Sequence, residues 1–252
     1  MKQLISVLFI FGLFVLAWQQ VVQHGLVSEL LLPSPFIVGE YLYYALTDGT
    51  LMSALSVTLI RLCIGYSLGI GLGILLGLFI SSNQLAHSTL GFVALGLQTL
   101  PSVCWAPLAL LWFGQTESAM YFVVVMGSMW AMMIATEQGV RSVPSLYIKA
   151  AQVMGSKKWH TYFTVTIPAS LPFILNGAKM GWAFAWRSLM AAEIYISIMS
   201  NIGIGQLLHF GRELNAMDQA LGIMLVIITV GLIVDRIIFF PLEKYLKKML
   251  GL

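Results

Sequence analysis

Six long apolar runs divide this chain, and they constrain its fold more than any other feature. The runs cover residues 4–22, 51–80, 87–113, 119–136, 173–198 and 220–240. About 20 apolar residues cross a bilayer as a helix, so each run has roughly the length of one span. Charged residues make up 9% of the chain, whereas about 25% is usual in a soluble domain. The sequence therefore predicts an all-α integral membrane protein with about six transmembrane helices.

Positive charge indicates which side of the membrane the chain ends occupy. The first run, residues 4–22, has no small-residue cleavage pattern after it, so we expect a retained helix. With six spans both termini lie on one side. If that side is the cytoplasm, Arg212 alone lies in an outer loop, and the inner segments hold Lys2, Arg141, Lys149, Lys157, Lys158, Lys179, Arg236, Lys244, Lys247 and Lys248. Because Lys and Arg favour the inner side, the sequence predicts cytoplasmic termini.

The second run carries glycines at regular intervals. Gly65, Gly69, Gly73 and Gly77 repeat every four residues, a spacing that lets helix backbones approach closely in lipid. This pattern predicts tight helix packing and carries no functional information by itself.

Charge and metal-ligand patterns exclude several classes of function. The net charge of +3 comes from basic residues spread between apolar runs, so no nucleic-acid partner is expected. Cys63 and Cys104 each stand alone in an apolar stretch, where they are expected to pack. The four histidines have no ligand spacing, and they are His24, His87, His160 and His209. We therefore expect no metal site.

Residues 141–172 form the one long polar segment between runs on the inner side. Pro144 suits the first turn of a helix, and an apolar stripe follows at Leu146, Ala150, Val153 and Met154. Gly155 can end that helix in the left-handed conformation, and Ser156 can cap a second helix. The segment therefore predicts two short helices that meet at Gly155. From periodicity alone, an amphipathic segment on the lipid surface is an open alternative.

This segment resembles the cytoplasmic loop of bacterial ABC-importer permeases, whose pattern is Glu-Ala-Ala, three residues, Gly, nine residues, then Ile-x-Leu-Pro. The matching residues are Ala150, Ala151, Gly155, Val165 and Pro168. The chain departs from the pattern at Lys149, where an acid is usual, and at Ile167, which replaces Leu. Residues 97–114, 139–147, 186–194 and 201–208 are similar to the nitrate, sulfonate and taurine branch of these permeases.

The resemblance implies a type I ABC-importer permease fold in one domain over residues 1–252, with a core over about 51–240. It also implies three partners besides the bilayer: a dimer of ABC ATPase subunits, an extracytoplasmic substrate-binding protein and a second permease copy. The chain lacks a Gly-x4-Gly-Lys-Ser/Thr loop, so no cofactor is expected here and the ATPase would bind ATP. The residues implied to contact the ATPase are Lys149, Ala150, Ala151, Gly155, Ser156, Lys157 and Trp159.

Charged residues inside spans indicate functional or structural sites, because charge is unfavourable in lipid. Arg61 lies in the second run, and Arg187 and Glu193 lie in the fifth. All three are candidates for the translocation pathway. Arg187 would attract an anion or form an interhelical ion pair, for example with Glu193 of a second copy. For Arg61, a structural or interfacial role is the alternative.

Aromatic residues and prolines in the runs have two interpretations each. Tryptophans can line a pathway or pack at interfaces, and the candidates are Trp105, Trp112, Trp130, Trp182 and Trp186. Pro101 and Pro107 are expected to kink the third span. Residues 32–48 are expected to form an amphipathic helix on the outer surface, and residues 200–217 form an outer loop that a binding protein could touch.

The sequence thus favours the permease subunit of an ATP-driven importer in the inner membrane. The solute is expected to be a small anion, such as a sulfonate, taurine or nitrate. The alternative is an ATPase-independent secondary transporter or channel, which commonly shows internal repeats; we find no convincing repeat. An intramembrane enzyme is disfavoured because neither Gly-x-Ser-x-Gly nor His-Glu-x-x-His occurs.

Overall fold

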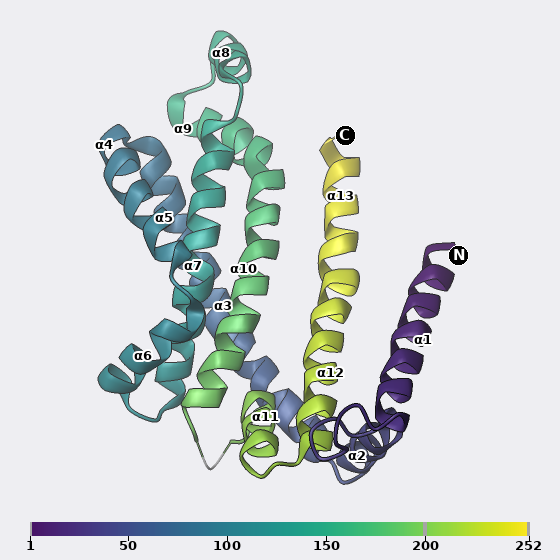
Figure 1. The fold of residues 1–252 in the computed structure, drawn as a ribbon. Coiled ribbons are helices and arrows are strands. Elements are labelled where there is room, and N and C mark those ends of the chain that lie inside the picture. The colour runs from purple at the N-terminus through teal and green to yellow at the C-terminus, as the bar shows by residue number, and fades with distance from the viewer. Residues whose placement is uncertain (1, 199–200, 251–252) are drawn as a thin grey trace. The chain divides into compact units, whose positions relative to one another are not determined.

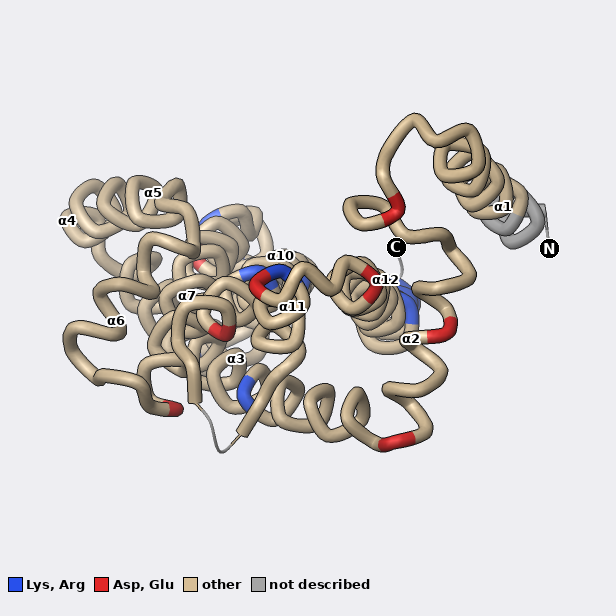
Figure 2. The backbone as a smooth tube through the Cα atoms, turned by 60° about the horizontal axis from the view of Figure 1, so that its bottom comes forward, with Lys and Arg blue, Asp and Glu red and all other residues tan. Residues whose placement is uncertain are grey.

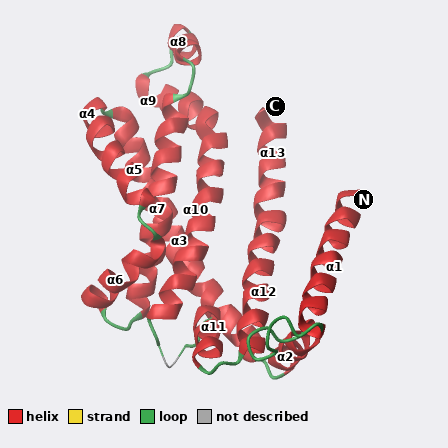
Figure 3. Ribbon diagram, in the orientation of Figure 1, coloured by secondary structure: helices red, strands yellow, loops and turns green. Residues whose placement is uncertain are grey.

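The computed structural model describes residues 2–198 and 201–250, and within them it contains helices and turns but no strand (Figure 3). The chain divides into two compact units. The first comprises residues 1–58 and 199–229, and the second comprises residues 59–198 and 230–252. Helices α3 (Thr50–Ser82) and α12 (Met217–Val234) pass through the boundaries. The expectation of one permease domain over residues 1–252 stays a prediction.

The first unit contains α1 (Lys2–Gln23), α2 (Pro35–Thr47), α11 (Ile204–Glu213) and the beginnings of α3 and α12. Helix α2 starts at Ser34, whose hydroxyl accepts a hydrogen bond from the Ile37 amide, and Pro35 occupies its first turn. The Thr58 hydroxyl accepts a bond from the Ile204 amide at 2.9 Å, which fixes the start of α11. The expected outer loop therefore contains a helix, and its residue 200 lies outside the described residues.

The second unit is built around α7 (Glu117–Arg141) and α10 (Ile167–Tyr195), which lie side by side (Figure 1). The α8–α9 turn, formed by α8 (Ser145–Val153), α9 (Lys158–Thr161) and the residues between them, lies beyond one end of this pair, and α6 (Trp105–Phe113) lies near the other end. The remaining helices of this unit are α4 (Gln84–Ala86), α5 (Phe92–Thr99) and α13 (Phe240–Leu250). Charged residues are sparse along both units (Figure 2).

The glycine repeat of α3 faces α7, which confirms the predicted close packing. A Cβ atom on Gly65 would lie 2.7 Å from the Val124 Cβ. On Gly73 it would lie 2.7 Å from the Met129 carbonyl oxygen, and on Gly77 it would lie 2.6 Å from the Met133 carbonyl oxygen. Since real Cβ atoms do not approach so closely, only glycine permits this approach of the two backbones.

The membrane-spanning character of the helices is confirmed, whereas the count of six spans is not. Three described helices are long and apolar enough to cross a membrane: Thr50–Ser82, Glu117–Arg141 and Met217–Met249. A broken pair, Gln84–Thr99 with Ser102–Phe113, would make a fourth. The apolar stretch described in α1, Phe9–Gln23, is shorter than these three helices and is not counted with them. Helix α10 carries Lys179, Arg187 and Glu193 and is not among the three.

The third apolar run is a broken helix pair instead of one kinked span. Its two parts are bent by 96° relative to each other. Leu100 is extended, with ψ 124°, and the chain stays extended at Pro101. The reason is steric, because proline disfavours the helical conformation of the residue before it. Pro107 lies in the first turn of α6, where proline is tolerated, so the expected kink at this residue was wrong.

Candidate functional site

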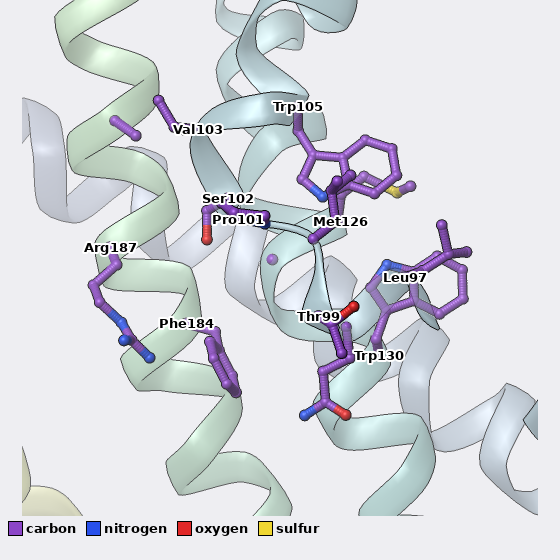
Figure 4. A pocket seen from close by; sticks show the side chains of 14 residues that line it. Leu97, Thr99, Pro101, Ser102, Val103, Trp105, Met126, Trp130, Phe184 and Arg187 are labelled. Atoms are coloured by element: carbon purple, nitrogen blue, oxygen red, sulfur yellow. The ribbon is translucent and has the colours of Figure 1, made fainter. Parts of the chain in front are cut away.

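The break between α5 and α6 borders a pocket of about 380 Å³ in the second unit (Figure 4). Residues 97–103 supply one wall. Helix α7 contributes Met126, Gly127 and Trp130, and α10 contributes Phe184, Arg187 and Ala191. Gly127 lets α10 pass close behind the pocket, because a Cβ atom there would lie 2.8 Å from the Ser188 Cβ. The pocket therefore depends on both the broken helix and the tight α7–α10 contact.

Arg187 is the one charged residue among those that line this pocket. Its side chain is exposed, and its guanidinium carbon lies 4.8 Å from the centre of the Phe184 ring. Its Nε donates a hydrogen bond to the Ala183 carbonyl at 3.1 Å. Across the described ranges it forms no ion pair with a carboxylate. The guanidinium is thus oriented by α10 itself while its charge is uncompensated.

The other polar groups in the described lining are uncharged, and the Thr99 hydroxyl among them already donates a hydrogen bond to the Gly96 carbonyl. Gln98, Thr99 and Ser102 flank the break, and Trp130 adds its indole. The Trp130 Nε1 is buried and has no hydrogen-bond partner among the described residues. No Asp or Glu is present in the described lining. Such a pocket is suited to a ligand with negative charge and hydrogen-bond acceptors.

Arg61 occupies a different environment, in which its charge is fully paired. Its Nη2 lies 2.6 Å from a Glu117 oxygen, and its Nη1 lies 3.0 Å from Glu193. The side chains of Arg61 and Glu193 are 2% and 0% exposed. The ion pairs join α3, α7 and α10. Neither Arg61 nor Glu193 lines the pocket, so the structure brings these two sequence candidates together and leaves Arg187 apart.

The α8–α9 turn has the expected helix–glycine–helix form. Gly155 has φ +88°, a conformation that favours glycine. The Gly155 amide donates to the Gln152 carbonyl, and the Ser156 amide donates to the Ala151 carbonyl, which closes α8 in a Schellman motif. Of the implied contact residues, Ala151 and Ser156 are half-buried, and the exposed ones are Lys149, Ala150, Gly155, Lys157 and Trp159.

Two details of this segment differ from the expectation. Ser156 does not cap the second helix, because its hydroxyl accepts a bond from the Thr161 hydroxyl and Lys157 occupies the N-cap position. The polar segment also ends earlier than residue 172. From α9 the chain continues through a π-helical turn, Tyr162–Thr166, directly into α10. The turn and the pocket are therefore joined by one continuous helical segment.

The tryptophans divide between the pocket and ordinary packing. Trp105 and Trp130 line the pocket. Trp182 and Trp186 stack on each other with ring centres 6.4 Å apart, and Trp112 packs edge-on against Phe122. Packing therefore accounts for Trp112, Trp182 and Trp186, and a place on a translocation pathway stays a prediction for Trp105 and Trp130.

Sequence reasoning missed two polar clusters of the second unit. Glu137 lies 2.9 Å from the His87 Nδ1 and 3.3 Å from the Arg141 Nε. The spacing of Glu137 and Arg141, four residues along a helix, was a usable signal for that pair.

In the other cluster, Lys179 lies 2.8 Å from Asp235 and 3.2 Å from Glu243. These partners are remote in sequence and carry no local signal. In the described part of the chain, no group of three or more His, Cys, Asp or Glu residues is placed to hold a metal.

Residues 69–240 match the family described as "Binding-protein-dependent transport system inner membrane component". The match covers more than half of the 252 residues. The chain therefore belongs to this family of membrane permeases, and it is a transport subunit of the inner membrane.

Relatives with curated descriptions confirm the branch. The chain is 34% identical over 204 residues to a protein of Methanocaldococcus jannaschii described as an ABC transporter permease, covering 79% of this chain and 74% of that one. It is 28% identical to the aliphatic sulfonates transport permease SsuC of Bacillus subtilis, covering 91% and 82%. It is also 28% identical to the nitrate import permease NrtB of Synechocystis, covering 83% and 78%.

A solved structure shows the same fold. The inward-facing MetNI methionine ABC transporter contains a chain that superimposes with a TM-score of 0.59 at 16% identity, covering 82% of this chain and 98% of that one. At this identity the likeness shows the fold alone, and it agrees with the permease fold expected from the sequence.

Proposed function

We propose that this chain is the membrane-spanning subunit of an ATP-driven importer and forms the pathway for a small anion such as a sulfonate, taurine or nitrate. Family membership supports the importer class, and the names of SsuC and NrtB support an anionic solute. The observation that carries the coupling to ATP is the exposed α8–α9 turn.

The α8–α9 turn has the character of a protein-docking surface. Val153, Met154 and Trp159 are 89%, 87% and 74% exposed, although a soluble surface rarely gathers such apolar side chains without a partner. The small side chains of Ala150 and Ala151 permit a groove on another protein to approach the helix closely. An ABC ATPase is the partner that fits a permease of this family, and it would bind the ATP that this chain has no loop to hold.

The helix that follows the turn can transmit motion to the pocket. From Lys158 the chain is helical without interruption to Tyr195, and Phe184 and Arg187 on this helix line the pocket. At 1.5 Å per residue the distance from the turn to Arg187 is about 40 Å. A displacement of the turn by the ATPase would therefore move one wall of the pocket, which is the mechanical requirement of alternating access.

The remaining assembly follows from the same proposal. A second copy of the chain would complete the pathway as a homodimer, and a substrate-binding protein would dock on the outer face. Both termini would be cytoplasmic, which places the turn and its lysines on the side where ATP is available.

Co-purification tests this proposal. The tagged chain would be expressed with its cognate ABC ATPase and purified in detergent as wild type, Gly155→Arg and Gly114→Arg. Gly114 is the matched control, because it also has positive φ (+65°) in open space but follows α6 at the other end of the unit. Gly114→Arg strains the backbone at least as much as Gly155→Arg, because Gly114 has ψ −160° in a region essentially restricted to glycine. Only Gly155→Arg lies in the proposed contact.

We expect stoichiometric recovery of the ATPase with wild type and Gly114→Arg, and its loss with Gly155→Arg. Recovery with Gly155→Arg equal to that with Gly114→Arg would contradict the docking site. If the wild type retains no ATPase and solute flux persists in ATP-free vesicles, the chain is a secondary transporter or channel.

A further inference from the structure

Arg187 is the one charged residue in the described lining of the pocket, and the described chain supplies no carboxylate to pair with it. Arg61 is bound by Glu117 and Glu193, and Lys179 is bound by Asp235 and Glu243. An exposed guanidinium on a membrane helix, with no carboxylate beside it, requires water or an anion to offset its charge. The pocket of about 380 Å³ beside it provides space for either.

We propose that this pocket is an oxyanion-binding site within the permease itself, with Arg187 as its charge. The inference rests on the proposed import function and adds that the membrane subunit discriminates by charge, independently of any binding protein. The ligand class is a small monovalent oxyanion, such as a sulfonate or nitrate.

The guanidinium is oriented for two-point binding. Its Nε donates to the Ala183 carbonyl, and its guanidinium carbon lies over the Phe184 ring, 4.8 Å from the ring centre. These contacts leave Nη1 and Nη2 to donate two parallel hydrogen bonds to two oxygens of one anion. A lysine ammonium would keep the positive charge but could not donate these two parallel hydrogen bonds.

A second observation points independently to a ligand with acceptor atoms. The Trp130 indole lines the pocket, and its Nε1–H is buried without a partner among the described residues. Buried donors almost always have a hydrogen-bond partner, and an acceptor atom of a bound ligand would supply one for the Trp130 Nε1–H. Gln98 and Ser102 add further donors on the opposite wall.

The same lining disfavours a cation. No carboxylate in the described lining can compensate a positive ligand, and Arg187 would repel it. The face of Phe184 is also occupied by the guanidinium, so this ring is not available to a second cation. The charge of the lining and the placement of its donors therefore both favour an anionic ligand.

The experiment compares two ligands of nearly equal shape that differ in charge. Methanesulfonate and its neutral analogue dimethyl sulfone each give one methyl NMR signal. Both would be added to the full-length permease in deuterated detergent, and saturation transfer to each methyl group would be titrated, with empty micelles as background. Nitrate would serve as a competitor. The variants are Arg187→Gln, Arg187→Lys, Trp130→Phe and the control Arg212→Gln, which removes an exposed arginine of α11 in the first unit.

We expect saturation transfer to methanesulfonate that reaches a plateau on titration and is suppressed by nitrate. Transfer to dimethyl sulfone should be no greater than in empty micelles. Affinity should fall at least about tenfold in Arg187→Gln, as for loss of a charge-assisted bond. A smaller fall is expected in Arg187→Lys and Trp130→Phe, and none in Arg212→Gln. Size-exclusion chromatography would confirm that each variant is folded.

Equal transfer to both ligands, or affinity in Arg187→Gln within twofold of wild type, would overturn the inference. So would the absence of methanesulfonate binding to the wild type. These results are separable from the import proposal, because recovery of the ATPase on the α8–α9 turn does not depend on Arg187. Failure of the wild type to retain the ATPase, with anion binding intact, would instead overturn the import proposal and leave the anion site standing.

Discussion

Two arginines of the second unit, Arg61 and Arg187, show how differently one residue type can be used in a membrane helix. Arg61 is 2% exposed, and its donors are met by Glu117 and Glu193 from two other helices. Arg187 is exposed beside a pocket, and it is held by a backbone carbonyl and an aromatic ring of its own helix. A charge that is buried and paired stabilises the helix bundle, whereas one that is oriented but unpaired remains available to a ligand.

The largest expected effect follows from breaking the buried ion pairs. Arg61→Gln would leave Glu117 and Glu193 without their cation, and loss of one partner of a buried pair is destabilising by about 3–5 kcal/mol. Thermal unfolding in detergent, followed by tryptophan fluorescence, would measure this. A loss below about 1 kcal/mol would show that the three helices do not depend on Arg61.

The opposite result is expected for Arg187→Gln. Because its side chain is exposed and pairs with no described acid, the free energy of unfolding should change by no more than about 0.5 kcal/mol. Anion affinity should nevertheless fall, as described above. Destabilisation comparable to that of Arg61→Gln would remove the distinction between the two arginines.

A smaller effect is expected from the helix contact that carries Arg61. A Cβ atom on Gly73 of α3 would lie 2.7 Å from a backbone oxygen of α7, whereas one on Gly71 meets no atom within 4 Å. Gly73→Ala should destabilise the protein by about 1–3 kcal/mol, the usual range for overpacking. Gly71→Ala is the control, and unfolding in the same detergent is the measurement. Equal stability of the two variants would contradict close α3–α7 packing.

The smallest effect concerns Asp48, an exposed charge in the turn before α3. Its carboxylate accepts a hydrogen bond from the Thr50 amide at 2.8 Å, and this bond lowers the pKa of Asp48 below its ordinary value. A lowered pKa in the folded state stabilises it above the unfolded-state pKa, and the stabilisation is lost as the pH falls through the folded-state pKa.

The Asp48 effect can be measured as the difference in melting temperature between pH 7 and pH 3. That difference should be slightly smaller in Asp48→Asn than in wild type. A larger difference in the variant would contradict the assigned direction of the pKa shift.

Features encoded by neighbouring residues were predictable from the sequence. The repeat from Gly65 to Gly77 predicted close helix packing, without naming α7 as the partner, and Gly155 predicted the end of α8. Both depend on local conformation or on a regular spacing. The resemblance to permeases added the family, which the match over residues 69–240 confirms.

Features that depend on tertiary contacts were not predictable. Glu117 and Glu193 are 56 and 132 residues from Arg61, so no spacing rule could pair them. The break at Pro101 was underestimated as a kink, although the effect of proline on Leu100 was a usable signal. Because the pocket exists only where this break meets α7 and α10, the place of Gln98 and Ser102 in its lining required the structure. Trp130 was a candidate from the sequence, but nothing there distinguished it from the tryptophans that only pack.

ATP-driven anion uptake tests the account most directly. The permease would be reconstituted with its ATPase in proteoliposomes and supplied with its binding protein, and uptake of labelled methanesulfonate and nitrate would be compared with and without ATP. We predict uptake that requires ATP in the wild type and is reduced at least about tenfold in Arg187→Gln, while Arg236→Gln, at an exposed arginine outside the described pocket lining, matches the wild type. Uptake that is equal without ATP, or absent for both anions in a complex that hydrolyses ATP, would contradict the account.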